Sequence, residues 1–135
     1  AIPEIACIGL TELEARSRGR DVRVGYCDFS EVARSQIVGN AEGLLKLVTD
    51  GDGQQLLGVH IIGEGATELV HIGQMAMAAA LPVEEFIHQV FNFPTMAEAY
   101  RIAAFQVGDP NRNGLSRSWM RKTQADAGST GEHRQ

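Results

Sequence analysis

Glu68 and His71 form the first of two groups of side chains whose spacing could support chemistry. Three residues apart on a helix, a carboxylate and an imidazole share one face, as they do in the di-iron carboxylate bundles. A di-iron site also needs a second such motif and further carboxylates on facing helices, and we expect no metal site in this chain. We interpret Glu68 and His71 instead as a polar stripe on a helix that contacts another subunit.

The second group lies in the stretch FNFPTMAEAY, residues 91–100. Thr95 and Glu98 have the spacing of a capping box, in which the Thr hydroxyl accepts from a backbone N–H and the Glu reaches back to the helix start. Glu98 also shares a helical stripe with Ile102 and Phe105, and an acid partly buried in this way usually has a partner. The residues alone leave two roles open, a helix cap and a functional carboxylate, and favour the cap.

Composition argues against several classes of function. The chain has 135 residues and a formal net charge of −5, so it has no basic field that would attract nucleic acid. It contains no run of about 18 apolar residues, and we expect no membrane span. The two cysteines, Cys7 and Cys27, do not form a C-x-x-C motif, which favours reduced, half-buried thiols in a cytoplasmic protein.

Hydrophobic periodicity predicts both strands and helices. The predicted strands cover residues 5–10, 21–29, 42–50 and 54–63, and the predicted helical segments cover 11–17, 30–35, 65–81, 83–91 and 94–107. The turn GDG between the third and fourth strands predicts a hairpin. This order indicates an α+β fold, in which an antiparallel sheet carries helices packed on one face.

Alternation along the hairpin predicts which side chains share a face. The apolar face is expected to carry Leu45, Leu47, Leu57, Val59 and Ile61.

The helix predicted at 65–81 is apolar most of the way round. One stripe contains Leu69, Ile72, Ala76 and Ala80, and apolar residues such as Val70, Met75, Met77 and Ala78 lie outside it. A helix of this kind is covered on more than one side, and in a small domain the second cover can be another subunit. We expect small residues, Gly73 among them, to allow close packing across a two-fold axis.

Three stretches of the chain resemble one known family. They are PEIACIGLTELEARSRG near the start, LLKLVTDGDGQQLLGVHIIGEGATELVHIGQMAM in the middle, and PTMAEA before the last predicted helix. In this order they resemble the C-terminal interface domain of the flavin-dependent pyridine nucleotide-disulfide oxidoreductases. The resemblance implies a dimerisation domain at 1–115 and a polar tail at 116–135, which we expect to be disordered. It also implies a homodimer, and a parent chain whose other domains bind FAD and NAD(P).

The residue before Pro94 departs from the family pattern. Most members have a His there, which pairs with the Glu of the next helix and serves a redox disulfide as acid and base; this chain has Phe93 and keeps Glu98. A phenyl ring cannot carry a proton, so we assign no catalytic residue. One branch of the family, the soluble pyridine nucleotide transhydrogenases, has a similar sequence here, close to F-N-Y-P-T-M-A-E-A-Y-R, and uses flavin without a dithiol.

That branch implies a parent oxidoreductase that moves hydride between NADH and NADP through FAD. The resemblance implies that Phe93 and Pro94 approach the flavin of the partner subunit. We expect the contact with that subunit to include Glu68, His71, Met75, Asn92, Thr95 and Glu98. This chain alone lacks the parts that bind most of the flavin and the nicotinamide, so we expect it to bind no cofactor and to be inactive by itself.

Two other functions remain open at this stage. The first is the interface domain of a dithiol-dependent flavin reductase, similar to dihydrolipoamide dehydrogenase, which would need a redox C-x-x-x-x-C upstream. The second is a stand-alone dimeric scaffold that keeps the fold without the cofactor.

Overall fold

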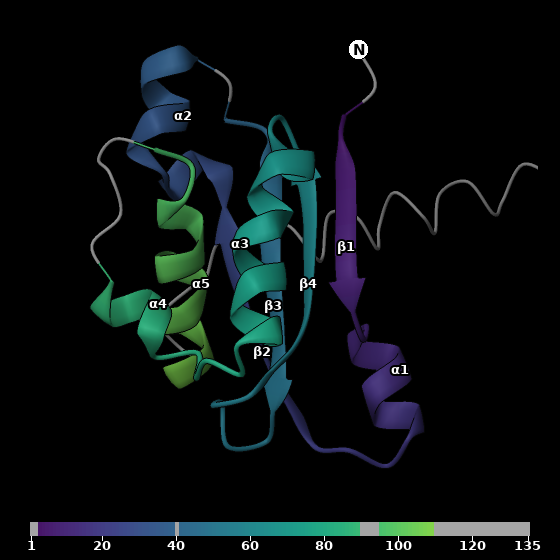
Figure 1. Ribbon diagram of the computed structural model, residues 1–135. Coiled ribbons are helices and arrows are strands. Elements are labelled where there is room, and N and C mark those ends of the chain that lie inside the picture. Colours follow the sequence, from purple (N-terminus) through teal and green to yellow (C-terminus); the bar gives the residue numbers. More distant parts are fainter. Residues whose placement is uncertain (1–2, 40, 90–94, 110–135) are drawn as a thin grey trace, which may run out of the picture.

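The computed structural model describes residues 3–39, 41–89 and 95–109 (Figure 1), and the tail predicted at 116–135 lies outside them. The strands are β1 (Ile5–Gly9), β2 (Val22–Asp28), β3 (Gly43–Asp50) and β4 (Leu56–Gly63). The helices are α1 (Glu12–Ser17), α2 (Ala33–Val38), α3 (Ala66–Ala78), α4 (Glu85–His88) and α5 (Glu98–Gly108), with a 3₁₀ turn, η1 (Phe29–Glu31), after β2.

One antiparallel sheet organises these elements. Its strands lie in the order β1–β4–β3–β2, and each neighbouring pair is antiparallel. On one face, α3 lies over β1 and β4 while α5 lies over β2 and β3, with α4 packed beside α5 (Figure 1). Their apolar sides bury a core with side chains such as Leu45, Leu47 and Val59. The predicted α+β fold is confirmed, with α3, α4 and α5 packed on one face.

The short helix α1 packs against the opposite face of the sheet. Its Ala15 is fully buried in a second, smaller cluster that includes Val48 and Leu57. Glu12 at the start of α1 also pairs with Lys46 of β3 at 3.4 Å. The opposite face is therefore covered in part by the described chain.

A β-bulge changes the face that Leu57 occupies. In the register of β3 with β4, Val48 pairs with Gly58 and Thr49 pairs with Leu56, which leaves Leu57 as an extra residue. Its side chain joins the smaller cluster and not the main core. The prediction that Leu57 shares a face with the other apolar residues of β4 is wrong, because counting in steps of two cannot detect an inserted residue.

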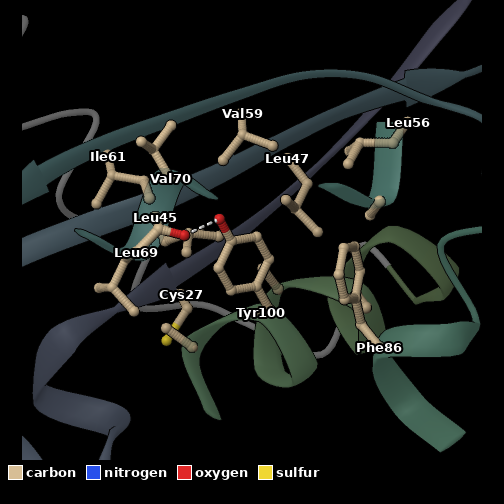
Figure 2. Close-up of a cluster of buried hydrophobic side chains, with 14 of the residues drawn as sticks. Cys27, Leu45, Leu47, Leu56, Val59, Ile61, Leu69, Val70, Phe86 and Tyr100 are labelled. Atoms are coloured by element: carbon tan, nitrogen blue, oxygen red, sulfur yellow. Dashed lines mark hydrogen bonds between the residues drawn. The ribbon is translucent and has the colours of Figure 1, made fainter. Parts of the chain in front are cut away.

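Tyr100 of α5 is fully buried at the centre of the core (Figure 2). Its hydroxyl donates to the backbone oxygen of Leu69 and accepts from the backbone N–H of Gly73 at 3.1 Å. Leu69 and Gly73 are i and i+4 in α3, so the hydroxyl binds the acceptor and the donor of one i to i+4 backbone hydrogen-bond position of the helix. Burial raises the pKa of Tyr100 to about 12, against the opposing effect of the Gly73 N–H, and the phenol stays protonated at neutral pH.

The end of α3 is a Schellman motif with an alanine in the position that favours glycine. Ala80 has φ of 52°, its N–H bonds to Met77 O, and the Leu81 N–H bonds to Ala76 O at 3.0 Å. The helix therefore ends at Ala78, earlier than the Pro82 boundary predicted from sequence. Because the chain turns at Ala80, Leu81 comes back over the last turn of α3.

We expect Ala80→Gly to stabilise the protein. A left-handed alanine costs about 1–2 kcal/mol, whereas the glycine gains about 0.4–1 kcal/mol of extra entropy in the unfolded state, so a net gain of about 0.5 kcal/mol is expected. Ala79→Gly is the matched control, since Ala79 has φ of −86° and should lose stability on substitution. Urea unfolding measures both; a destabilised Ala80→Gly variant would contradict the assignment of strain to this turn.

Candidate interface site

The three residues predicted on the outer stripe of α3 do lie together there. Glu68 and His71 are exposed, and Met75 follows one turn later with 68% of its surface exposed. The side chain of His71 contacts that of Gln74 at 3.0 Å between Nδ1 and Oε1. A methionine this exposed beside polar residues is a typical component of a protein–protein contact.

An apolar groove runs beside this stripe, between α3 and α4. It has a volume of about 590 Å³ and an almost wholly apolar lining. Its lining includes His71, Ile72, Met75, Ala76, Leu81 and Phe86. Leu81, just after α3, is 45% exposed, so water contacts two large apolar side chains of the groove, Met75 and Leu81.

The inner side of α3 differs from the prediction. Gly73 and Ala76 are buried against the sheet, and so is Val70, which the sequence placed outside the core stripe. A Cβ on Gly73 would lie 2.6 Å from Val59 Cγ2, so the close approach that glycine allows here is to the domain's own sheet. The expectation that Gly73 packs against a second subunit is wrong.

The Glu-x-x-His spacing recurs at Glu85 and His88 on α4, which the sequence analysis missed. Glu85 lines the groove opposite His71. Across the part of the chain that the structure describes, however, no three His, Cys, Asp or Glu side chains gather to hold a metal ion. We interpret Glu85 and His71 as the polar rim of the groove.

Asn92, Phe93 and Pro94, predicted to approach flavin and partner, lie outside the described residues. Thr95 and Glu98, just after them, are half-buried. The capping box predicted for this pair is wrong: α5 begins at Glu98, and its N-cap residue Ala97 makes no side-chain cap hydrogen bond.

The chain enters α5 through a tighter turn. The N–H groups of Glu98 and Ala99 bond three residues back, to Thr95 O at 3.4 Å and Met96 O at 3.0 Å. This is the pattern of a 3₁₀ turn, which satisfies the first donors of α5 through backbone oxygens.

Neither cysteine is placed for thiol chemistry with the other. Cys7 is exposed on β1, whereas Cys27 is fully buried on β2. Burial, with the charges of Glu31 and Asp28, raises the pKa of the Cys27 thiol well above its ordinary value. A buried thiol of this kind is inert, so Cys27 is a small core residue.

None of the helices in the described ranges is long and apolar enough to cross a bilayer.

Glu4, near the start of the sequence, caps the N-terminus of α3. The N-cap residue of α3, Gly65, has φ of 82° and no side chain to offer. The Glu4 carboxylate accepts from the Gly65 N–H and, at 3.0 Å, from the Thr67 hydroxyl. An anion at a helix N-terminus is also favoured by the helix dipole. The sequence analysis missed this contact, because Gly65 and Thr67 lie 61 and 63 residues after Glu4 in the sequence.

Residues 1–104 match the family model described as the pyridine nucleotide-disulphide oxidoreductase dimerisation domain. The chain belongs to this family. The fold is therefore that of a dimerisation domain.

Similar proteins include soluble pyridine nucleotide transhydrogenases. The chain is 45% identical over 107 residues to one from Mycobacterium bovis and 43% identical over 119 residues to one from Hahella chejuensis, which cover 79% and 86% of it. Among solved structures, the HOCl-induced flavoprotein disulfide reductase RclA from Escherichia coli is 28% identical over 75% of the chain, with a TM-score of 0.70. The chain spans 23% of the RclA chain and 23–24% of these two transhydrogenases.

We expect Glu4→Ala to lower stability by about 1 kcal/mol, the usual loss when a helix N-cap acceptor is removed. The amides of the first turn of α3 should exchange faster with deuterium, because their carboxylate partner is gone. Glu4→Gln is the matched control: it keeps an acceptor oxygen and should retain most of the protection. Unchanged exchange in Glu4→Ala would show that the cap contributes nothing in solution.

Proposed function

We propose that the chain forms a homodimer through the outer stripe and the groove of α3 and α4. The observation that carries this proposal is the exposure of Met75 and Leu81 at a groove whose lining is almost wholly apolar. In a two-fold dimer the same patch meets itself, so an apolar centre with a polar rim is self-complementary. The rim offers hydrogen-bonding groups, with His71 and Glu85 lining the groove and Glu68 exposed one turn before His71 on α3.

We further propose that the parent protein is a FAD-dependent soluble pyridine nucleotide transhydrogenase, and that it is cytoplasmic. The names of the relatives and the small share of their length that this chain spans support a parent with additional domains for flavin and nicotinamide. When bound, the flavin would accept hydride from one nicotinamide and return it to another. In this proposal the present chain supplies the subunit contact and carries no nucleotide-binding function of its own.

Phe93 supports the assignment to a flavoprotein that works without a dithiol. A phenyl ring cannot exchange protons with a thiol, and hydride transfer between nicotinamide and flavin makes no demand for a proton carrier at this place. We propose that Phe93 and Pro94 approach the partner subunit's flavin, and that Asn92, Thr95 and Glu98 contribute to the subunit contact. Glu98 then has a structural role, since its usual imidazole partner is absent from the sequence.

We expect Met75→Glu to weaken dimerisation of this chain. A carboxylate in a desolvated apolar seam costs about 2 kcal/mol or more, which is about a 30-fold rise in the dissociation constant. Leu13→Glu on α1 is the matched control, because Leu13 is 78% exposed and lies far from the groove in the chain. Sedimentation equilibrium over a wide concentration range measures both. A wild-type chain that stays monomeric, or an equal effect of the two variants, would contradict the proposed seam.

A second test addresses the chemistry of the longer flavoprotein. Glu98→Gln should change the rate of hydride transfer from NADPH to an NAD analogue less than about threefold, because loss of a true general acid or base would cost about 10²–10⁴-fold. Absorbance of the reduced analogue gives the rate. A fall of about 100-fold, or disulfide-dependent oxidation of NADPH, would favour the dithiol reductase instead.

A further inference from the structure

Tyr100 contacts both walls of the groove from behind. Its hydroxyl binds the Leu69–Gly73 rung of α3, and its ring packs against Phe86 of α4 with the ring centroids 5.0 Å apart (Figure 2). Phe86 itself lines the groove. The side chain therefore connects the two helices whose separation determines the shape of the groove.

The hydroxyl contact allows little freedom for α3. A buried phenol must keep its hydrogen bonds, and both of its partners are backbone groups of one turn of α3. Gly73 also has no room to move toward the sheet, because Val59 and Tyr100 Oη occupy the space beside it. If α3 slid or rotated, it would break these bonds or collide with the sheet.

We propose that Tyr100 is a positioning residue for dimerisation. It holds α3 and α4 at the separation at which the groove accepts a second copy of this chain. This inference rests on the dimer proposed above. It assigns the pre-organisation of the dimer-forming groove to one hydroxyl group. Tyr100 does not contact the partner; it acts through the backbone of α3 and the ring of Phe86.

Tyr100→Phe tests the proposal, because it removes the hydroxyl and keeps the ring. We expect the dissociation constant of the dimer to rise about tenfold, measured by sedimentation at a temperature where circular dichroism shows every variant folded. Val48→Ala is the matched control for stability: Val48 is fully buried in the cluster on the opposite face of the sheet, and its truncation should lower stability without changing the dissociation constant.

Phe86→Leu provides a second test that does not depend on how well Tyr100→Phe folds. It leaves the hydroxyl bonds in place and removes the aromatic contact, and it should also weaken the dimer by about tenfold. If both folded variants kept the wild-type dissociation constant while Met75→Glu broke the dimer, Tyr100 would have only a structural role and the proposed seam would stand. If wild type were monomeric, both proposals would fall. An effect of Val48→Ala as large as that of Tyr100→Phe would reduce the result to general instability and overturn the inference.

Discussion

The hydroxyl of Tyr100 imposes the constraint on which the helical layer depends. A phenol with no access to water must find its partners in the protein, and here it takes both from the backbone of α3. Those groups can be reached only because Gly73 has no side chain between the helix and the sheet. The position of α3 over β1 and β4 thus follows from one buried polar group and one glycine, in addition to the apolar area that the helix covers.

The two sides of α3 consequently differ in how they are packed. The inner side is tightly packed, and a single added carbon at Gly73 would meet Val59 at 2.6 Å. The outer side leaves Met75 exposed to water, next to the apolar groove that Leu81 also lines. A rigid inner contact and an adaptable apolar outer contact are what a helix needs if it belongs to a core and to an interface together. Methionine suits the outer position, since its flexible side chain adapts to an irregular partner surface.

Sequence patterns predicted the elements well where the signal is local. The alternation around the GDG turn located the β3–β4 hairpin, and the run after Gly65 located α3. Two of the failures share one physical cause, which is that the deciding contact was not local. The bulge at Leu57 depends on pairing with β3, and the cap of α3 comes from Glu4, which is 61 residues before Gly65 in the sequence. The end of α3 was misplaced because a left-handed alanine carries no mark in the sequence.

The site was predictable in part for the same reason. The exposed stripe of Glu68, His71 and Met75 follows from helical spacing, which a sequence shows directly. The inner partner of that stripe does not: Tyr100 stands 27 residues beyond Gly73 and 31 beyond Leu69. Its hydroxyl, moreover, carries no periodic signal that separates it from an ordinary core aromatic residue. The family match identifies this chain as a dimerisation domain. The hydrogen bonds of the Tyr100 phenol give a physical reason why the groove between α3 and α4 keeps one shape.

Helix α5 also joins Tyr100 to Phe93 and Pro94, the residues that the proposal places near flavin. Tyr100 lies in the first turn of α5, two residues after Glu98 and six after Pro94 in the chain. The backbone bonds that start α5 therefore place the phenol, and the phenol in turn places α3. If the subunit contact and the approach to flavin both depend on α5, a change in the helix start would alter the two together. The retention of Glu98 without its imidazole partner is consistent with this structural demand, because the residue begins the helix that carries Tyr100.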